Sequence, residues 1–144
     1  QIVDCGGYKQ NAPLVFDLAQ LEADLKFVLM GTEEQSGYKE IDPTFLQEDL
    51  AVEEKRAIDA SLAYRGSTST DESLRRCYNI VGLIRERAQR ISRGDEYGRA
   101  YLYCLLYWTL RKTRLPGRIH SVKCIFAFYS AGLIIRKLED WASA

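Results

Sequence analysis

The sequence has few of the residues from which catalytic and metal sites are built. It contains one histidine, His120, so a zinc site with several histidine ligands cannot form within the chain. Any Ser-His-Asp or Cys-His arrangement would depend on that one residue. No G-x-x-x-x-G-K or G-x-G-x-x-G phosphate-binding motif is present. We therefore expect a protein that is not an enzyme and that uses no metal and no cofactor.

Neighbouring acidic residues do not change this expectation. The pairs Glu33-Glu34, Glu48-Asp49 and Glu53-Glu54 are adjacent in sequence, and adjacent helical side chains point about 100° apart. Asp49 and Glu53, one turn apart, would share a helix face. Such a pair is far more often a solvated surface than a site for acid–base chemistry, and we expect a solvated surface here.

Long hydrophobic runs are also missing. A transmembrane helix needs about 18 or more apolar residues, whereas the two apolar runs within 97–137 reach only about a dozen each. We therefore expect no action on membranes. Because a basic segment joins the two runs, insertion of this hairpin into a membrane is a minor alternative. The start of the chain shows no signal peptide. Because it begins at Gln1, we expect a processed product or a fragment.

The four cysteines form no CxxC pair. Cys77, Cys104 and Cys124 fall in apolar helical stretches, which favours buried free thiols in a reducing, intracellular compartment, either the cytoplasm or the nucleus. The alternative is a disulfide or a reactive thiol, for which Cys5 in the N-terminal segment is the candidate.

Helical periodicity dominates the rest of the chain. Its 144 residues, 47% of them hydrophobic, suffice for one domain with one core. We expect an irregular lead-in over 1–12 and a helical domain over 13–144, an all-α bundle of about five helices. The expected helices cover 13–30, 43–64, 71–93, 95–115 and 119–141.

The apolar positions indicate how these helices pack. In helix 71–93 the core face is predicted to hold Leu74, Cys77, Val81, Ile84, Ala88 and Ile91. Residues 100–110 are apolar on all sides except Thr109, which places the last two helices as a central hairpin. Helix 43–64 is rich in acids and is expected to be peripheral. Helix 13–30 carries a leucine stripe and a second stripe of Phe16, Ala23 and Phe27, which we predict to be a spare contact surface.

Charge is divided unequally between the halves, although the net charge is zero. Residues 1–72 carry 15 acidic and 6 basic side chains, a net of −9, and residues 73–144 carry 5 acidic and 14 basic ones, a net of +9. Such polarity suits either binding of an external polyanion or docking between acidic and basic surfaces.

Two basic features stand out in the second half. On helix 71–93, Arg76, Leu83, Arg87 and Arg90 fall on the side opposite the core face, with Arg75 nearby. The segment joining the last two helices adds Arg111, Lys112, Arg114 and Arg118. We expect the fourth helix to return antiparallel along the third, which would place Arg75 and Arg76 close to this segment and create one anion-binding surface.

The sequence therefore predicts a non-enzymatic helical binding module. Its basic half would engage nucleic acid or an acidic protein surface, and a domain of a viral nucleocapsid- or polymerase-associated protein fits this profile. The alternative is a self-assembling structural protein, a homo-oligomer in which acidic and basic halves meet head to tail, with Phe16, Ala23 and Phe27 at the centre of the contact.

Overall fold

The computed structural model describes residues 12–29, 48–92, 95–113 and 122–143. These residues form five α-helices and no strand: α1 (Ala12–Asp24), α2 (Glu48–Ala60), α3 (Glu72–Ile91), α4 (Asp95–Lys112) and α5 (Val122–Ser143). α1 continues as a π-helical turn, η1 (Leu25–Leu29), and α2 continues as a 3-10 turn, η4 (Ser61–Ala63). The predicted all-α bundle is confirmed, while the expected lead-in lies almost wholly outside the described residues.

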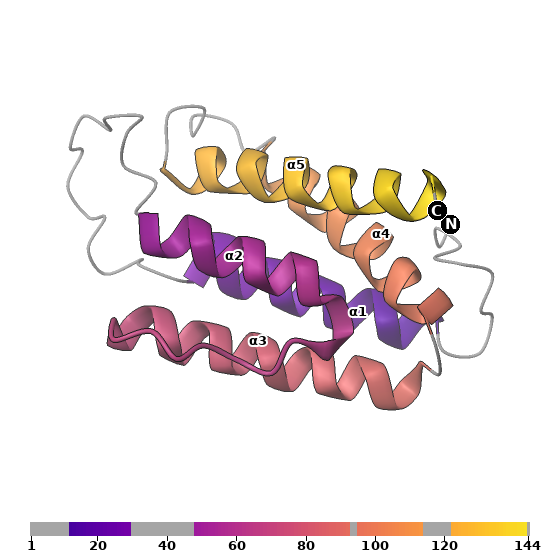
Figure 1. Cartoon of the computed structure of the whole chain (residues 1–144), viewed down its shortest axis with the longest axis horizontal. Coiled ribbons are helices and arrows are strands. Elements are labelled where there is room, and N and C mark those ends of the chain that lie inside the picture. Colours follow the sequence, from indigo (N-terminus) through magenta and orange to yellow (C-terminus); the bar gives the residue numbers. More distant parts are fainter. Residues whose placement is uncertain (1–11, 30–47, 93–94, 114–121, 144) are drawn as a thin grey trace.

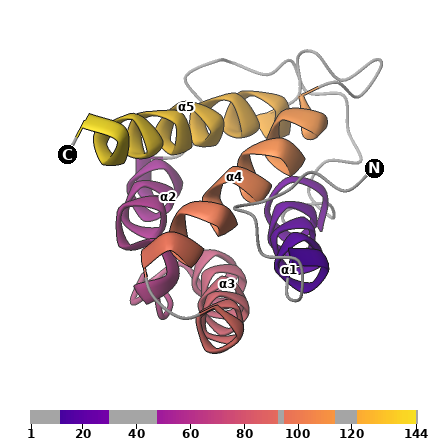
Figure 2. The ribbon, with the colours of Figure 1, turned by 90° about the vertical axis from the view of Figure 1, so that its right-hand side faces the viewer.

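The helices are arranged around α4. Seen end-on in Figure 2, α4 rises diagonally from α3 to α5, with α1 on one side and α2 on the other. The middle of α4 is fully buried at Tyr101, Leu102 and Leu105. α4 and α5 pack against each other as the predicted hairpin, and α5 covers the bundle along one edge in Figure 1.

The start of α3 follows from its sequence. Asp71 has extended backbone angles, and its side-chain Oδ1 accepts a hydrogen bond from the backbone N–H of Leu74 at 3.0 Å. This N-cap satisfies a donor that the first turn leaves free. All but one of the predicted core residues of this helix are buried, and Ile91 is partly buried against them. The predicted core face of α3 is confirmed.

The face of α1 that enters the core differs from the prediction. Leu14 and Leu21, from the leucine stripe, are 46% and 52% exposed. Ala23 and Phe27 are buried instead, and Phe16 packs against the rings of Tyr107 and Trp108 on α4. The prediction of a spare contact stripe is therefore wrong. Leu18 and Leu25 of the leucine stripe are partly buried against the core, so only part of that stripe faces outward. The inward side carries Glu22 and Lys26 as well as apolar residues, because their charges are paired within the core.

The acidic helix α2 is not peripheral, which corrects a second expectation. Glu53, Glu54, Ala57 and Ile58 are all buried. Glu54 has no exposed surface, and Glu53 is only 4% exposed. The prediction of a solvated Asp49 and Glu53 pair is thus wrong for Glu53. Asp49 is exposed, whereas Glu53 is buried in the protein. Apolar periodicity underestimated the burial of this helix because it counts a buried carboxylate as a surface residue.

The segment from η4 to α3 is fastened to both neighbouring helices. The Ser67 backbone N–H donates to Oδ1 of Asn79 on α3 at 3.0 Å, and the Ser67 hydroxyl donates to Glu53 on α2 at 2.6 Å. Gly66 has a φ of 128° and lies against Asn79. A glycine is required at that backbone angle. Residues 65–70, which we call the connector, therefore tie α2 to α3.

Candidate functional site

The predicted basic residues of α3 lie on its outer surface. Arg76, Arg87 and Arg90 are exposed, and Leu83 among them is 64% exposed. We call these four residues the basic ridge. Ile80, 45% exposed, lies beside them on the same helix. The ridge thus combines guanidinium groups with apolar side chains that are open to solvent.

Two of the three ridge arginines pair with acids on their own helix. Arg76 Nη2 lies 2.6 Å from Glu72 Oε1, and Arg90 Nη2 lies 3.2 Å from Glu86 Oε1. Both are exposed pairs at helical spacing, and such pairs contribute little to stability. Arg87 has no ion-pair partner within the described part of the chain. These pairs leave the ridge only mildly basic, with an apolar centre.

The remaining predicted cations do not join the ridge. Arg75 is half-buried and donates to the Ser69 carbonyl at 3.2 Å, so it helps hold the connector. Arg111 stacks on the rings of Tyr107 and Trp108, 5.7 and 5.8 Å from their centroids. Lys112 pairs with Asp24 of α1. Arg114 and Arg118 lie outside the described residues, as does His120.

The expected return of the fourth helix along the third is wrong. Figures 1 and 2 show α4 leaving the end of α3 and climbing across the bundle to α5. The end of α4, with Arg111 and Lys112, therefore lies on the α5 side, away from the start of α3. The reason is that α4 is apolar all round and fills the centre between α1 and α5, instead of covering one side of α3.

The described residues contain a second charged group that the sequence analysis missed. Glu22, Lys26, Glu54 and Arg85 come from α1, η1, α2 and α3, and all four side chains have no exposed surface. We call them the buried ion cluster. It holds two carboxylates and two cations, so its formal charge is zero. Buried charges are tolerated only when they are paired and hydrogen-bonded.

Glu22 and Arg85 form the first half of the cluster. The Arg85 guanidinium donates to both Glu22 oxygens, from Nε at 2.7 Å and from Nη2 at 2.8 Å. This two-point geometry is the strongest arrangement of a carboxylate and a guanidinium. Tyr101 of α4 donates its hydroxyl to the same carboxylate at 2.8 Å. Arg85 also donates to the backbone carbonyls of Ala57 and Ser61 at the end of α2 and in η4.

Lys26 and Glu54 form the second half. The Lys26 ammonium lies 2.9 Å from Glu54 Oε2 and 2.8 Å from Glu22 Oε2, so it bridges the two carboxylates. Glu54 also accepts hydrogen bonds from the hydroxyls of Tyr78 on α3, at 2.8 Å, and Ser130 on α5. Every α-helix therefore contributes a side chain to the cluster or a hydrogen bond to it.

Electrostatics fixes the charges of these groups. Burial alone would raise the pKa of Glu22, but the nearby charges of Arg85 and Lys26 outweigh it and lower that pKa to about 2. Burial opposes the charged form of Lys26 as well, yet the two carboxylates raise its pKa. Burial also raises the pKa values of Tyr78 and Tyr101 well above their usual range. Glu22 and Lys26 are thus charged at neutral pH, and Tyr78 and Tyr101 are protonated and act as donors.

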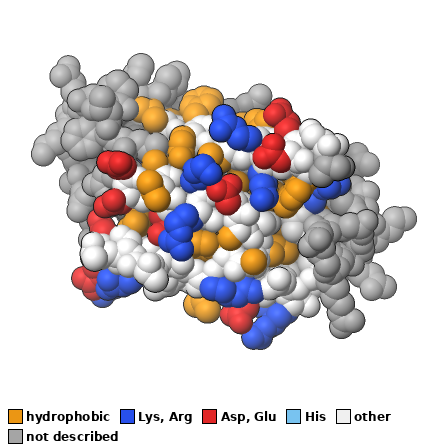
Figure 3. Space-filling model, in the orientation of Figure 1, with side chains coloured by type: hydrophobic (Ala, Val, Ile, Leu, Met, Phe, Trp, Pro, Cys, Tyr) orange, Lys and Arg blue, Asp and Glu red, His pale blue; other side chains and the backbone are white. Residues whose placement is uncertain are grey.

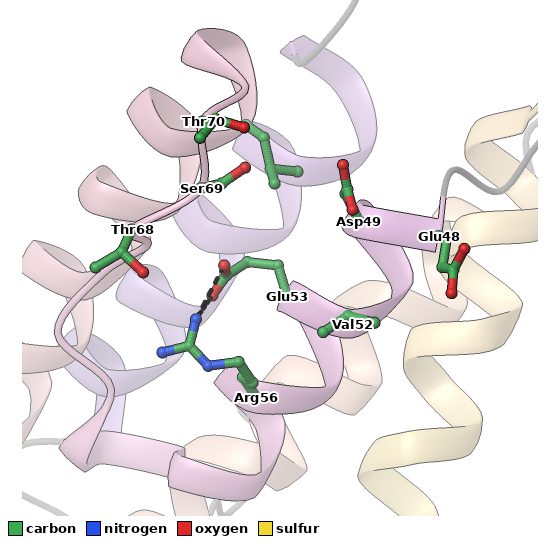
Figure 4. Close-up of a pocket in the computed structure, with 9 residues that line it drawn as sticks. Glu48, Asp49, Val52, Glu53, Arg56, Thr68, Ser69 and Thr70 are labelled. Carbon is green, nitrogen blue, oxygen red and sulfur yellow. Dashed lines mark hydrogen bonds and ion pairs between the residues drawn. The ribbon is translucent and has the colours of Figure 1, made fainter.

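A surface hollow of about 340 Å³ lies between α2 and the connector, with Glu53 at its base (Figure 4). The Glu53 carboxylate accepts from Arg56 at 2.9 Å, from the Tyr64 hydroxyl at 2.5 Å and from Ser67 at 2.6 Å. Its oxygens are therefore engaged by the protein itself. These hydrogen bonds hold the connector against α2, and we assign the hollow no chemistry.

The cysteines follow the prediction in part. Cys77 and Cys124 are buried and form no disulfide, and burial raises the pKa of the Cys77 thiol to about 12. Cys104 is also buried, but it is disulfide-bonded, which the expectation of a free core thiol did not foresee. Cys5 lies outside the described residues. The prediction of a reducing compartment loses the support that it drew from a free Cys104.

The described residues bring no three metal-ligating side chains together. None of the described helices is both long enough and apolar enough to cross a bilayer.

Comparisons of the chain with protein families, with curated proteins and with solved structures gave no match. The assignment of function therefore depends on the chain's own geometry. One sequence signal could have revealed the buried ion cluster: Glu22 and Lys26 share a helix face with Val15, Ala19 and Ala23, whose small side chains suit a closely packed interior.

Proposed function

We propose that this chain is a non-enzymatic helical binding module and that the basic ridge docks on an acidic protein surface. The observation that carries the proposal is the exposure of Leu83 and Ile80 between arginines on one face of α3. Apolar side chains interspersed with arginine are typical of protein interfaces, where the apolar centre is desolvated and arginine pairs with carboxylates.

An acidic protein surface fits this ridge better than nucleic acid does. A phosphate backbone offers nothing apolar for Leu83 to contact, and nucleic-acid affinity rises with the number of unpaired cations. Glu72 and Glu86 already neutralise Arg76 and Arg90 in part. The aromatic rings next to Arg111 are occupied by its own guanidinium and are not free to stack on bases. The narrower expectation of a viral nucleocapsid- or polymerase-associated protein stays a prediction that rests on charge polarity.

Fluorescence anisotropy with two labelled probes tests the proposal. One probe is an acidic helical peptide composed of glutamate and leucine, and the other is a single-stranded oligouridine. Each probe is titrated at about 50 and 200 mM salt. We expect the peptide to bind more tightly. Both Leu83→Gln and Arg87→Gln should weaken it by about fivefold or more. Both residues are exposed, so the fold should be unaffected.

The matched control is Lys55→Gln, which removes an exposed cation from α2 and should leave peptide binding unchanged. Stronger binding of the oligouridine, with loss on Arg87→Gln but none on Leu83→Gln, would assign the ridge to nucleic acid instead. If the peptide does not bind, or if neither ridge variant affects it, the ridge is not a docking surface.

A further inference from the structure

The outer face of α5 exposes apolar side chains that have no partner within the described part of the chain. Phe128 is 60% exposed and Ile135 is 42% exposed, and Gly132 lies between them on the same side of the helix. Figure 3 shows hydrophobic side chains lying open to solvent among lysines and arginines on the face where α5 runs over α2. Exposed apolar patches of this kind mark interaction sites.

Gly132 is not closely packed against any other part of the chain that the structure describes. A Cβ added at Gly82 would lie 2.5 Å from the backbone of Arg65, and one at Gly98 would touch Ser61. A Cβ added at Gly132 would meet nothing within 4 Å. Glycine in the middle of a helix lowers helix stability. Its presence here is explained if something from outside approaches the α5 backbone closely.

The same face holds both an exposed aromatic ring and a hollow. The hollow measures about 370 Å³ and is lined by Phe128, Tyr129, Gly132, Leu133, Arg136 and Lys55. Phe128 and Arg136 both line the hollow and are both exposed. Phe128 comes four residues before Gly132, and Arg136 comes four residues after it. A twofold axis at Gly132 therefore places Phe128 of one copy opposite Arg136 of the other.

We propose that two copies of this chain dimerise through α5, packed antiparallel about Gly132. Each Phe128 ring enters the hollow of the other copy and lies against the Arg136 guanidinium, a favourable cation–π contact. The glycines on the axis let the two helix backbones approach. A twofold contact of this kind uses one self-complementary patch twice and closes at two copies. It differs from the head-to-tail assembly expected from the charge halves.

Charge selects the antiparallel orientation. In a parallel pair, identical residues of the two copies lie at the same level along the helix axis. Arg136 would then face Arg136, and Glu139 would face Glu139. In the antiparallel pair, Arg136 faces the Phe128 ring and Glu139 faces Ile125. Like charges are separated and the cation meets the electron-rich ring, so the antiparallel pair is favoured.

Sedimentation velocity from about 5 to 500 µM tests the proposal. We expect a concentration-dependent monomer–dimer equilibrium in the unmodified chain. Phe128→Gln should raise its dissociation constant by about tenfold or more. Gly132→Leu should do the same by filling the axis, while circular dichroism shows the helix content retained. The matched control is Leu21→Gln, which removes an exposed leucine from α1 and should leave the dimer unchanged.

Orientation is read from disulfide cross-linking of mixed variants. Phe128→Cys mixed with Arg136→Cys should give the mixed dimer in excess over either self-linked dimer. A chain that stays monomeric throughout the range contradicts the proposal. So does a dimer that both the Phe128 and Gly132 variants leave intact, or one in which Phe128→Cys links mainly to itself.

Discussion

Replacing Lys26 by methionine tests the role of the buried ion cluster. The substitution keeps most of the volume of the side chain but leaves Glu22 and Glu54 with one cation, Arg85, between them. One negative charge then stays buried without compensation. Breaking a buried ion pair by removing one partner costs about 3–5 kcal/mol, against a total stability of about 5–15 kcal/mol for a domain. We expect Lys26→Met to lower the unfolding free energy by about 3–5 kcal/mol in urea titrations at neutral pH.

The double variant Lys26→Met with Glu54→Gln separates charge from packing. It removes one cation and one carboxylate, so the remaining Glu22 and Arg85 pair is neutral and keeps its two-point contact and the Tyr101 hydrogen bond. The double variant should be more stable than the sum of the single losses implies, with a coupling of about 1–3 kcal/mol.

A surface pair of similar geometry supplies the control. Lys55 and Asp59 are also spaced i,i+4 and lie 2.7 Å apart, but their side chains are 57% and 56% exposed. Lys55→Met should therefore cost less than about 1 kcal/mol. If Lys26→Met costs no more than Lys55→Met, or if the two cluster substitutions are additive, the cluster does not act as a charge-balanced unit and the reasoning fails.

Three further predictions follow from named contacts. Because the folded-state pKa of Glu22, about 2, lies below its ordinary value of 4.5, its contribution to stability should be complete above pH 4.5 and lost as pH falls towards 2; Glu22→Gln should flatten this acid limb in urea titrations. Gly82→Ala should lose about 1–3 kcal/mol through its clash with Arg65, whereas Gly132→Ala, measured on dilute protein, should gain about 0.5–1 kcal/mol. The Cys77 thiol should not react with a thiol reagent at about pH 8 until urea exposes it; fast labelling of the native chain would show that Cys77 is accessible.

The sequence allowed the helices to be predicted because each one follows from local signals. Asp71 caps α3 as expected, and the apolar spacing of α3 identified its core face. Residues 100–110, apolar on nearly all sides, correctly indicated a helix in the centre of the bundle. These features depend on contacts within a few residues, so periodicity and capping rules capture them.

The interior faces of α1 and α2 could not be predicted in the same way. Periodicity assigns Glu22, Lys26 and Glu54 to the surface, because a charge on its own does not belong in a core. Whether it can be buried depends on Arg85, which is 63 residues away from Glu22 in the chain. Such compensation appears only when distant helices meet, and so does the path of α4 away from α3.

The exposure of the ridge was predictable, but which of the basic residues belong to it was not. Periodicity correctly placed Arg76, Leu83, Arg87 and Arg90 opposite the core face of α3. The role of Arg75 as a support for the connector depends on where Ser69 lies. Likewise, the stacking of Arg111 on Tyr107 and Trp108 depends on side-chain geometry at the end of α4.

Chemical-shift mapping of the isotope-labelled chain with the acidic glutamate–leucine peptide tests the central functional claim most directly. The account predicts that backbone shifts concentrate on the outer side of α3, around Arg76, Ile80, Leu83 and Arg87. Residues of the buried ion cluster and the outer face of α5 should be unaffected. Shifts that spread evenly over all exposed cations, or that avoid α3, would contradict the claim that the basic ridge is the docking surface.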